Sequence, residues 1–269
     1  MRGSQLVPAG KAAICSISRS ASSIPATKLN WKQDTVYLYQ FPRSPVVPNL
    51  SPYCLKVETF LRIKNIKYEV IETSFKRSAR GRLPFVELNG EQIPDSHLII
   101  TRLAKHFDAQ DTLSREERAV GRAVDAMLDS STLWALQPDR IVNNSDKFAS
   151  RAVSGMPLPG FVTNLLGKRM AGVMEGRMRQ ALGKESNDEI KERLKNDLEA
   201  IDALIGNKRF LFGPVPSAVD CSIFGHIASA YFLPYRQALS DFIDDDFSSL
   251  KGHLFRIREH YYPEWKERH

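Results

Sequence analysis

Short alternating runs of apolar and polar residues in the first part of the chain predict a small mixed sheet. Residues 36–41 (VYLYQF) are aromatic and β-branched, as strands usually are. Asn89-Gly90 is a strong two-residue hairpin signal between two further apolar runs. Apolar residues also recur at helical spacing behind good N-cap residues. The expected elements are strands over 36–41, 68–72, 83–88 and 91–93, and helices over 51–65 and 95–107.

From about residue 114 onward the apolar spacing is helical throughout. Capping-box patterns and long runs of helical spacing support this prediction: Ser114 with Glu117, Ser217 with Asp220, 118–136 and 187–205. The pattern therefore predicts an α/β module followed by an all-helical domain. We expect a disordered basic leader over 1–33, the α/β module over 34–108, a linker over 109–117 and the helical domain over 118–269.

The charge of the chain is concentrated in the leader. Lysine and arginine number 38 against 31 aspartate and glutamate residues, a net charge of +7. The first 33 residues contain five basic residues and no acid, so the rest of the chain carries only +2. This distribution argues against a nucleic-acid-binding face. The leader is typical of a mitochondrial transit peptide or of a disordered extension, and we expect a cytoplasmic protein with a mitochondrial location as the alternative.

Several other classes of protein are disfavoured by composition. No stretch approaches the roughly 20 consecutive apolar residues of a spanning helix. The three cysteines, Cys15, Cys54 and Cys221, are too scattered for a disulfide framework, and the histidines lack metal-ligand spacing, so we expect no metal. Residues 161–182 mix apolar and basic side chains. They predict either a core-facing helix with a basic outer stripe or a helix at a membrane surface.

Four short motifs together resemble the glutathione S-transferase fold, a thioredoxin-like α/β domain followed by an all-α domain. Ser51-Pro52-Tyr53-Cys54 stands where thioredoxin-fold proteins carry a C-x-x-C or S-x-x-C site, and Leu83-Pro84 matches a cis-proline before the third strand. Asp95-Ser96 matches the pair that holds the γ-glutamyl end of glutathione, and Ser217 with Asp220 matches a structural N-capping box.

Longer stretches narrow this resemblance to one family. Four stretches are similar to the failed axon connections family, which includes cadmium-responsive proteins and is related to the metaxins. They are LYQFPR, PNLSPYCLKVETFLR, GRLPFVELNGEQIPDSHLII and FLFGPVPSAVDCSIFGHIA. The resemblance covers about residues 34–260, and the leader lies outside it.

The resemblance implies two alternatives for the start of the first helix. The Ser51 hydroxyl would stabilise the glutathione thiolate, or Ser51 is only an N-cap. Cys54 would be a nucleophile activated by the helix start, or it is a small buried hydrophobe. Tyr53 lies at the same helix start, and we expect it to be a packing aromatic.

The other predicted contacts would hold the middle and the two ends of the ligand. The resemblance implies that the backbone at Leu83 and Pro84 pairs with the cysteinyl part of glutathione, and that Asp95 and Ser96 hold its γ-glutamyl end. The alternatives are a strand-start proline with a trans bond and a simple helix cap. Arg80 and Arg82, just before this proline, would reach the glycyl carboxylate or remain solvated loop charges.

Two functions follow as expectations from the resemblance. The leading one is a glutathione transferase-like protein that binds glutathione and, if active, conjugates it to electrophiles in stress or metal detoxification. The alternative is a non-catalytic scaffold of the same fold, acting in axon development or in a metaxin-like mitochondrial role. Expected partners are glutathione or a similar thiol peptide, a second copy in a homodimer, and a membrane surface through peripheral association; no nucleic acid is expected.

Overall fold

The computed structural model describes residues 24–265. A five-stranded sheet holds the first part of this range in the order β1-β5-β4-β2-β3. Only β2 and β3 are parallel to each other; the other neighbours are antiparallel. The strands are β1 (Ile24–Pro25), β2 (Val36–Gln40), β3 (Tyr68–Glu72), β4 (Phe85–Leu88) and β5 (Glu91–Pro94). The four predicted strands are therefore confirmed, and β1 is an addition.

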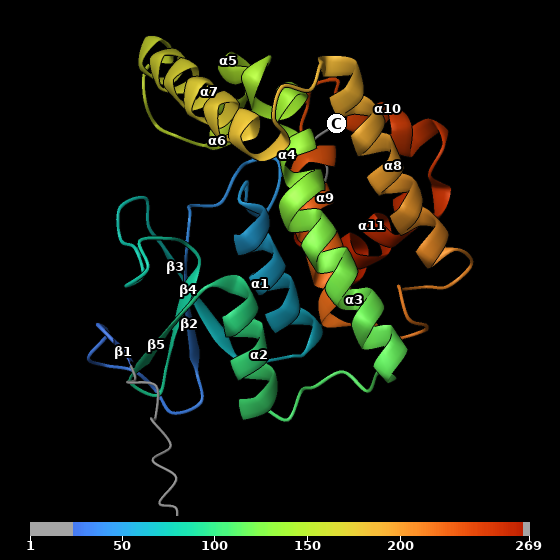
Figure 1. Ribbon diagram of the computed structural model, residues 1–269. Helices are drawn as coiled ribbons and strands as arrows, with labels where there is room; N and C mark the ends of the chain where they lie inside the picture. The colour runs from blue at the N-terminus through green and yellow to red at the C-terminus, as the bar shows by residue number, and fades with distance from the viewer. Residues whose placement is uncertain (1–23, 266–269) are drawn as a thin grey trace, which may run out of the picture.

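Helices α1 (Pro52–Ile63) and α2 (Ser96–His106) cover the sheet face turned toward the rest of the molecule, as Figure 1 shows. Side chains alternate along β2, so Val36 and Leu38 enter the core with these helices. The intervening Tyr37 and Tyr39 point to the other face and join a separate cluster with Phe85. Since the two faces of β2 are both apolar, both must be covered.

Residues 24–33 cover part of the outer face, so the prediction of a disordered leader is wrong for this segment. The backbone N–H groups of Thr27 and Lys28 donate to the Glu87 carboxylate at 2.8 and 3.0 Å, and the Thr27 hydroxyl donates to it at 2.7 Å. Tyr39 adds a fourth donor at 2.9 Å. A carboxylate buried in a sheet needs such donors, and the preceding chain supplies them. Residues 1–23 of the predicted leader lie outside the described residues.

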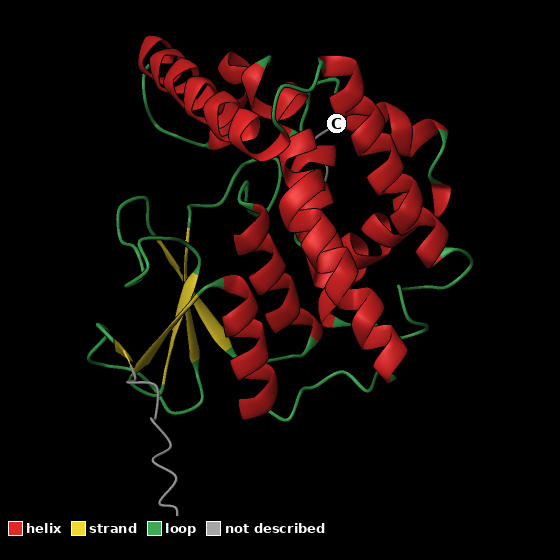
Figure 2. Cartoon of the chain, in the orientation of Figure 1, coloured by secondary structure: helices red, strands yellow, loops and turns green. Residues whose placement is uncertain are grey.

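The second part of the molecule is helical, as predicted, and Figure 2 shows no strand among its described residues. The long helix expected over 118–136 exists but changes its winding, since α3 continues into a π-helical turn and then into α4. The elements are α3 (Arg115–Met127), η1 (Leu128–Thr132), α4 (Leu133–Ala135), η2 (Pro138–Val142), α5 (Ser145–Ala149), α6 (Arg151–Ser154), α7 (Gly160–Leu182), α8 (Asn187–Ile205), α9 (Ala218–Tyr231), α10 (Ala238–Asp245) and α11 (Ser248–Tyr261). The domain boundary at 109–117 remains a prediction.

Helix α9 joins the two parts by packing directly on α1. It is apolar nearly all round and buried along its length, as a central helix should be. The two helices approach each other closely at Gly225. A β-carbon there would lie 2.6 Å from the Pro52 carbonyl oxygen and 2.8 Å from the Lys56 backbone nitrogen. The missing side chain at Gly225 is therefore what allows α9 to lie against the beginning of α1.

Candidate functional site

Helix α1 begins as its sequence predicts. Ser51 is the N-cap: its hydroxyl oxygen accepts the Cys54 backbone N–H at 3.4 Å, and Pro52 occupies the first helical position. The preceding loop is held by Asn49, whose side chain accepts the Ser51 N–H at 2.9 Å and donates to the Phe41 carbonyl at 2.8 Å. The same hydroxyl also acts on the Cys54 side chain, so Ser51 both caps the helix and faces the thiol.

Cys54 faces the interior rather than the helix start. Its side chain has no solvent exposure, and burial raises the pKa of the thiol to about 11, although the Ser51 hydroxyl and the Phe41 backbone act in the opposite direction. A nucleophilic cysteine requires a lowered pKa and access to its substrate. The geometry of Cys54 therefore supports the small buried hydrophobe over the nucleophile.

The two other ligand motifs lie at the ends of neighbouring elements. The Leu83–Pro84 peptide bond is cis, as the resemblance implied, and it leads into β4. Asp95 caps α2: its Oδ1 accepts the His97 and Leu98 backbone N–H groups at 3.1 and 3.2 Å. Asp95 is exposed and has a φ of 75°, a left-handed conformation that aspartate and asparagine tolerate.

Tyr53 is where these motifs meet the helical domain. Its hydroxyl hydrogen-bonds the Asp129 carboxylate, and its electrostatic surroundings also include Arg82 and Asp95. Its ring packs edge-on against His226, with ring centres 5.3 Å apart. Tyr53 at the start of α1 therefore meets η1 and α9, and the charges of Arg82 and Asp95 act on its hydroxyl.

Asp129 and His226 complete what we call the Tyr53 cluster, which consists of Tyr53, Asp129 and His226. His226 is fully buried; its Nδ1 lies 2.9 Å from the Ser222 carbonyl oxygen and its Nε2 lies 3.2 Å from Asp129 Oδ1. A carbonyl oxygen can only accept, so Nδ1 carries a proton. The Asp129 side chain is 48% exposed and opens the cluster to solvent.

The charges of the Tyr53 cluster set the ionisation of its members. Burial, followed by the charge and hydrogen bond of Asp129, raises the pKa of Tyr53, so the phenol remains a donor. Burial alone would raise the pKa of Asp129, but His226, Lys56 and Tyr53 outweigh it and lower that pKa. The cluster therefore presents an ionised carboxylate beside a neutral phenol at physiological pH.

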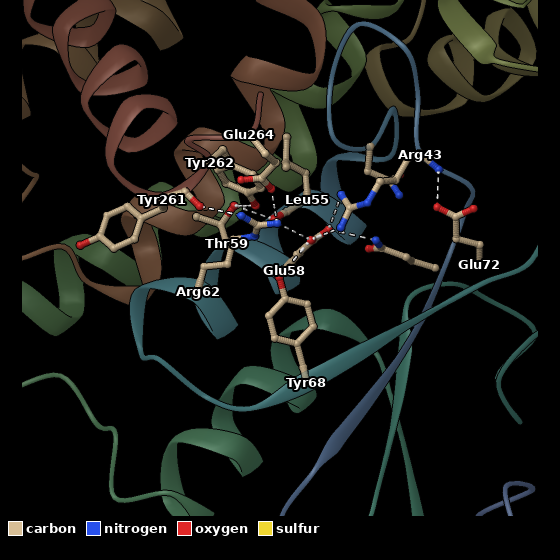
Figure 3. Close-up of polar contacts among 12 residues, drawn as sticks. Arg43, Leu55, Glu58, Thr59, Arg62, Tyr68, Glu72, Tyr261, Tyr262 and Glu264 are labelled. Atoms are coloured by element: carbon tan, nitrogen blue, oxygen red, sulfur yellow. Dashed lines mark hydrogen bonds and ion pairs between the residues drawn. The ribbon is translucent and has the colours of Figure 1, made fainter. Parts of the chain in front are cut away.

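A second polar cluster lies further along α1 and is drawn in Figure 3. Its centre is Glu58, a carboxylate with no solvent exposure, and we call it the Glu58 cluster. Gln40 Nε2 and the Tyr68 hydroxyl donate to it at 2.9 and 3.1 Å, and Arg43 and Arg62 lie 2.5 and 3.2 Å from it. Four donors from β2, β3, α1 and the loop after β2 thus surround one buried charge.

Residues 261–265, which end α11 and follow it, cover the Glu58 cluster. Arg62 donates to the Tyr261 carbonyl at 2.7 Å, pairs with Glu264 at 2.6 Å and stacks over the Tyr262 ring. Figure 3 shows these residues converging on Arg62 from the helical domain. The Trp265 indole N–H donates to the Val46 carbonyl at 2.9 Å. This cluster consequently ties the two parts of the molecule together.

Ser217 and Asp220 form the predicted structural cap at the start of α9. The buried Asp220 carboxylate accepts the Ser217 backbone N–H and hydroxyl, both at 2.7 Å, and lies 2.9 Å from His253 Nε2. Burial alone would raise the pKa of Asp220, but His253 and the Leu211 and Ser217 donors lower it. Among residues 24–265, no group of three or more histidine, cysteine, aspartate or glutamate side chains is arranged to hold a metal ion.

Sequence reasoning missed the Tyr53 cluster as a unit. The sequence correctly predicts Tyr53 at the start of a helix, but it predicts a packing role alone for this side chain. Asp129 belongs to no recognisable sequence motif. The π-helical turn at Leu128–Thr132 is the one local irregularity that marks the position, and such turns are frequent at functional sites. The apolar residues over 118–136 keep helical spacing through this turn, so their pattern does not indicate the π-helical winding.

Comparison with known proteins agrees with this fold. Models of the glutathione S-transferase N-terminal and C-terminal domains match residues 52–147 and 194–257. A solved glutathione S-transferase of Ceriporiopsis subvermispora, in complex with glutathione, superposes with a TM-score of 0.60 at 19% identity, over 83% of this chain and 96% of that one. The chain therefore belongs to the glutathione S-transferase superfamily, with a thioredoxin-like domain and an all-α domain.

Sequence relatives place the chain in one branch of that superfamily. Failed axon connections of Drosophila melanogaster is 35% identical over 89% of this chain, which spans only 61% of that protein's length. Mouse metaxin-2 is 22% identical over 91% of this chain and 94% of its own. The chain is thus a metaxin-related member of the superfamily, as the sequence motifs predicted.

Proposed function

We propose that the protein binds glutathione or a closely similar thiol tripeptide between its two domains. The cis Leu83–Pro84 bond before β4 carries the proposal, together with the helix caps at Ser51 and Asp95, because all three have the local geometry expected of the ligand motifs. Asp95 would bind the ligand's ammonium group with the carboxylate oxygen that does not cap the helix, and Ser96 would bind its carboxylate. The glutathione complex of the similar fungal structure supports the ligand class.

Ser51 is our proposed partner for the ligand's thiolate. Its hydroxyl stands at the start of α1, where the partial positive charge of the helix favours an anion. Transfer of the thiolate to an electrophile would depend on this donor and on positioning, with no contribution from Cys54.

Titration of the full chain with reduced glutathione tests the proposal. We expect calorimetric binding in the micromolar to millimolar range, weakened about 10- to 100-fold by Asp95→Asn, since one charge-assisted contact is worth about 1.5–3 kcal/mol. Asparagine caps a helix as well as aspartate does and tolerates the same φ, so this variant removes the charge and keeps the fold. Asp108→Asn is the matched control, because Asp108 is also exposed with a positive φ but stands at the other end of α2.

The absence of both heat and thermal shift would overturn the binding proposal. A non-catalytic interaction protein is the second candidate, and one observation favours it: the pKa values of Tyr53 and Cys54 are both raised, the reverse of an activated group. The metaxin relative supports the same candidate. Glutathione binding without turnover of any electrophile would select it.

Location and assembly remain proposals. No described helix is both long and apolar enough to cross a membrane. We propose a cytoplasmic protein, with a mitochondrial association as the alternative that the metaxin similarity supports. The homodimer remains a prediction from the resemblance, as do the roles in cadmium response and detoxification.

A further inference from the structure

Helix α7 lies in a part of the helical domain that neither glutathione S-transferase domain model matches. It occupies Gly160–Leu182, between the segments that the two domain models match. In Figure 1 its first turns, at the upper left, project beyond the other helices. A long helix at this position presents one face to the protein and the opposite face to its surroundings.

The inner face of α7 is firmly seated. Thr163, Gly167 and Met178 are its buried residues and share one side of the helix. A β-carbon at Gly167 would collide with the Ser145 carbonyl oxygen, so the glycine lets α7 lie directly on α5 (Ser145–Ala149). The orientation of the outer face is therefore determined by this packing.

The outer face carries large apolar side chains that nothing in the described chain covers. Phe161 is 79% exposed and Leu165 is 70% exposed, and Leu166 and Val173 follow at 42% and 46%. Phe161 and Leu165 lie one turn apart, near the projecting end. Single exposed apolar residues are ordinary on a surface, but a contiguous group of this kind marks a contact surface.

The same face is basic. Lys168, Arg169, Arg177 and Arg179 are all exposed on α7. The sole acid in the helix, Glu175, is paired with Arg179 at 2.6 Å. Apolar side chains flanked by basic ones characterise helices that lie in the headgroup region of anionic membranes.

We propose that α7 binds the surface of an anionic lipid bilayer. Phe161 and Leu165 would enter the acyl boundary, and the basic side chains would contact the headgroups. A second copy of the chain fits this surface less well, because two such basic faces would repel each other. Without a spanning helix among residues 24–265, this contact would be peripheral and would weaken with salt.

Vesicle co-sedimentation of the full chain tests the proposal with two lipid compositions. We expect binding to phosphatidylcholine vesicles that contain about a third phosphatidylserine, and little binding to phosphatidylcholine alone. Phe161→Ser with Leu165→Ser should abolish the binding. Lys168→Gln with Arg169→Gln should weaken it about 25-fold, because each basic residue near an anionic surface contributes about fivefold.

Matched controls stand elsewhere on the helical domain. Lys208→Gln with Arg209→Gln removes two adjacent exposed basic residues, and Val215→Ser removes an exposed apolar one. Both should leave vesicle binding unchanged. The proposal would be overturned if anionic vesicles failed to sediment the protein, if the α7 variants bound as well as the wild type, or if light scattering showed that Phe161→Ser with Leu165→Ser dissolves a dimer.

Discussion

Helix α1 contributes to two polar clusters that differ in their exposure to solvent and in how completely their carboxylates are hydrogen-bonded. The Glu58 cluster is closed: its carboxylate is fully buried and has donors from four segments. The Tyr53 cluster is open, because the Asp129 side chain is 48% exposed. A buried charge with a complete set of partners cannot easily accept another, whereas a half-exposed one can. This difference favours the start of α1, rather than the Glu58 cluster, as the proposed glutathione-binding site.

The largest expected effect comes from breaking the closed cluster. Glu58→Gln should lower the free energy of unfolding by about 3–5 kcal/mol, because it leaves the arginines on either side without their buried anion. Urea denaturation measures the loss. Glu69→Gln is the control: Glu69 is half-exposed and 3.7 Å from Lys32, so its loss should stay below about 1 kcal/mol. Equal losses would remove the distinction between the buried and exposed carboxylates.

A smaller effect is expected where α9 meets the start of α1. Gly225→Ala should cost about 1–3 kcal/mol, because the new methyl group collides with the backbone at Pro52 and Lys56. Thermal unfolding, with glutathione titration on the folded protein, measures both stability and the site. Gly172→Ala on α7 is the control, since nothing lies within 4 Å of its β-carbon, and alanine favours a helix there. A stable Gly225→Ala variant would contradict the close packing.

The cap of α1 offers a finer test of the open cluster. Ser51→Ala and Ser114→Ala should each cost about 1 kcal/mol, since both remove an N-cap hydroxyl. Only Ser51→Ala should also weaken glutathione binding or turnover, because Ser114 caps α3. If the two variants bind glutathione alike, Ser51 is a cap and nothing more.

The smallest expected effect is the acid sensitivity of Asp129. Its pKa is lowered in the folded protein, so it stabilises the fold above the unfolded value of 3.8 and loses this contribution as the pH falls through the lower folded pKa. Since the side chain is half-exposed, the amount should be below about 1 kcal/mol. The stabilities of wild type and Asp129→Asn, measured by urea denaturation, should converge as the pH falls below about 4. A constant difference would show that Asp129 acts through packing alone.

Local chemistry made much of the fold predictable. The hairpin at Asn89-Gly90, the caps at Ser51, Ser114 and Ser217, and the aromatic and β-branched run of β2 each act over a few residues, and the structure confirms them. The leader prediction is wrong over 24–33, because composition does not report that a buried carboxylate at Glu87 needs donors from a distant segment.

The site was predictable only in part. Ser51, Pro84 and Asp95 stand in recognisable motifs. Ser51 and Asp95 cap the starts of α1 and α2, and Pro84 directly precedes β4. The roles assigned to them remain proposals. Tyr53 was recognised as lying at the helix start, but its partners were not. Asp129 and His226 come from different helices, and neither has a local sequence signal that distinguishes it from an ordinary surface acid or core histidine.

The amino-acid sequence by itself determined the order of strands and helices, the caps that begin them and the superfamily to which the chain belongs. These follow from interactions between residues close in sequence and from motifs that can be read directly. The tertiary structure decided that Cys54 is buried, that Glu58 is enclosed and that Tyr53 meets Asp129 and His226. Exposure and ionisation depend on which distant segments pack together, and here the absent side chain of Gly225 brings α9 against α1.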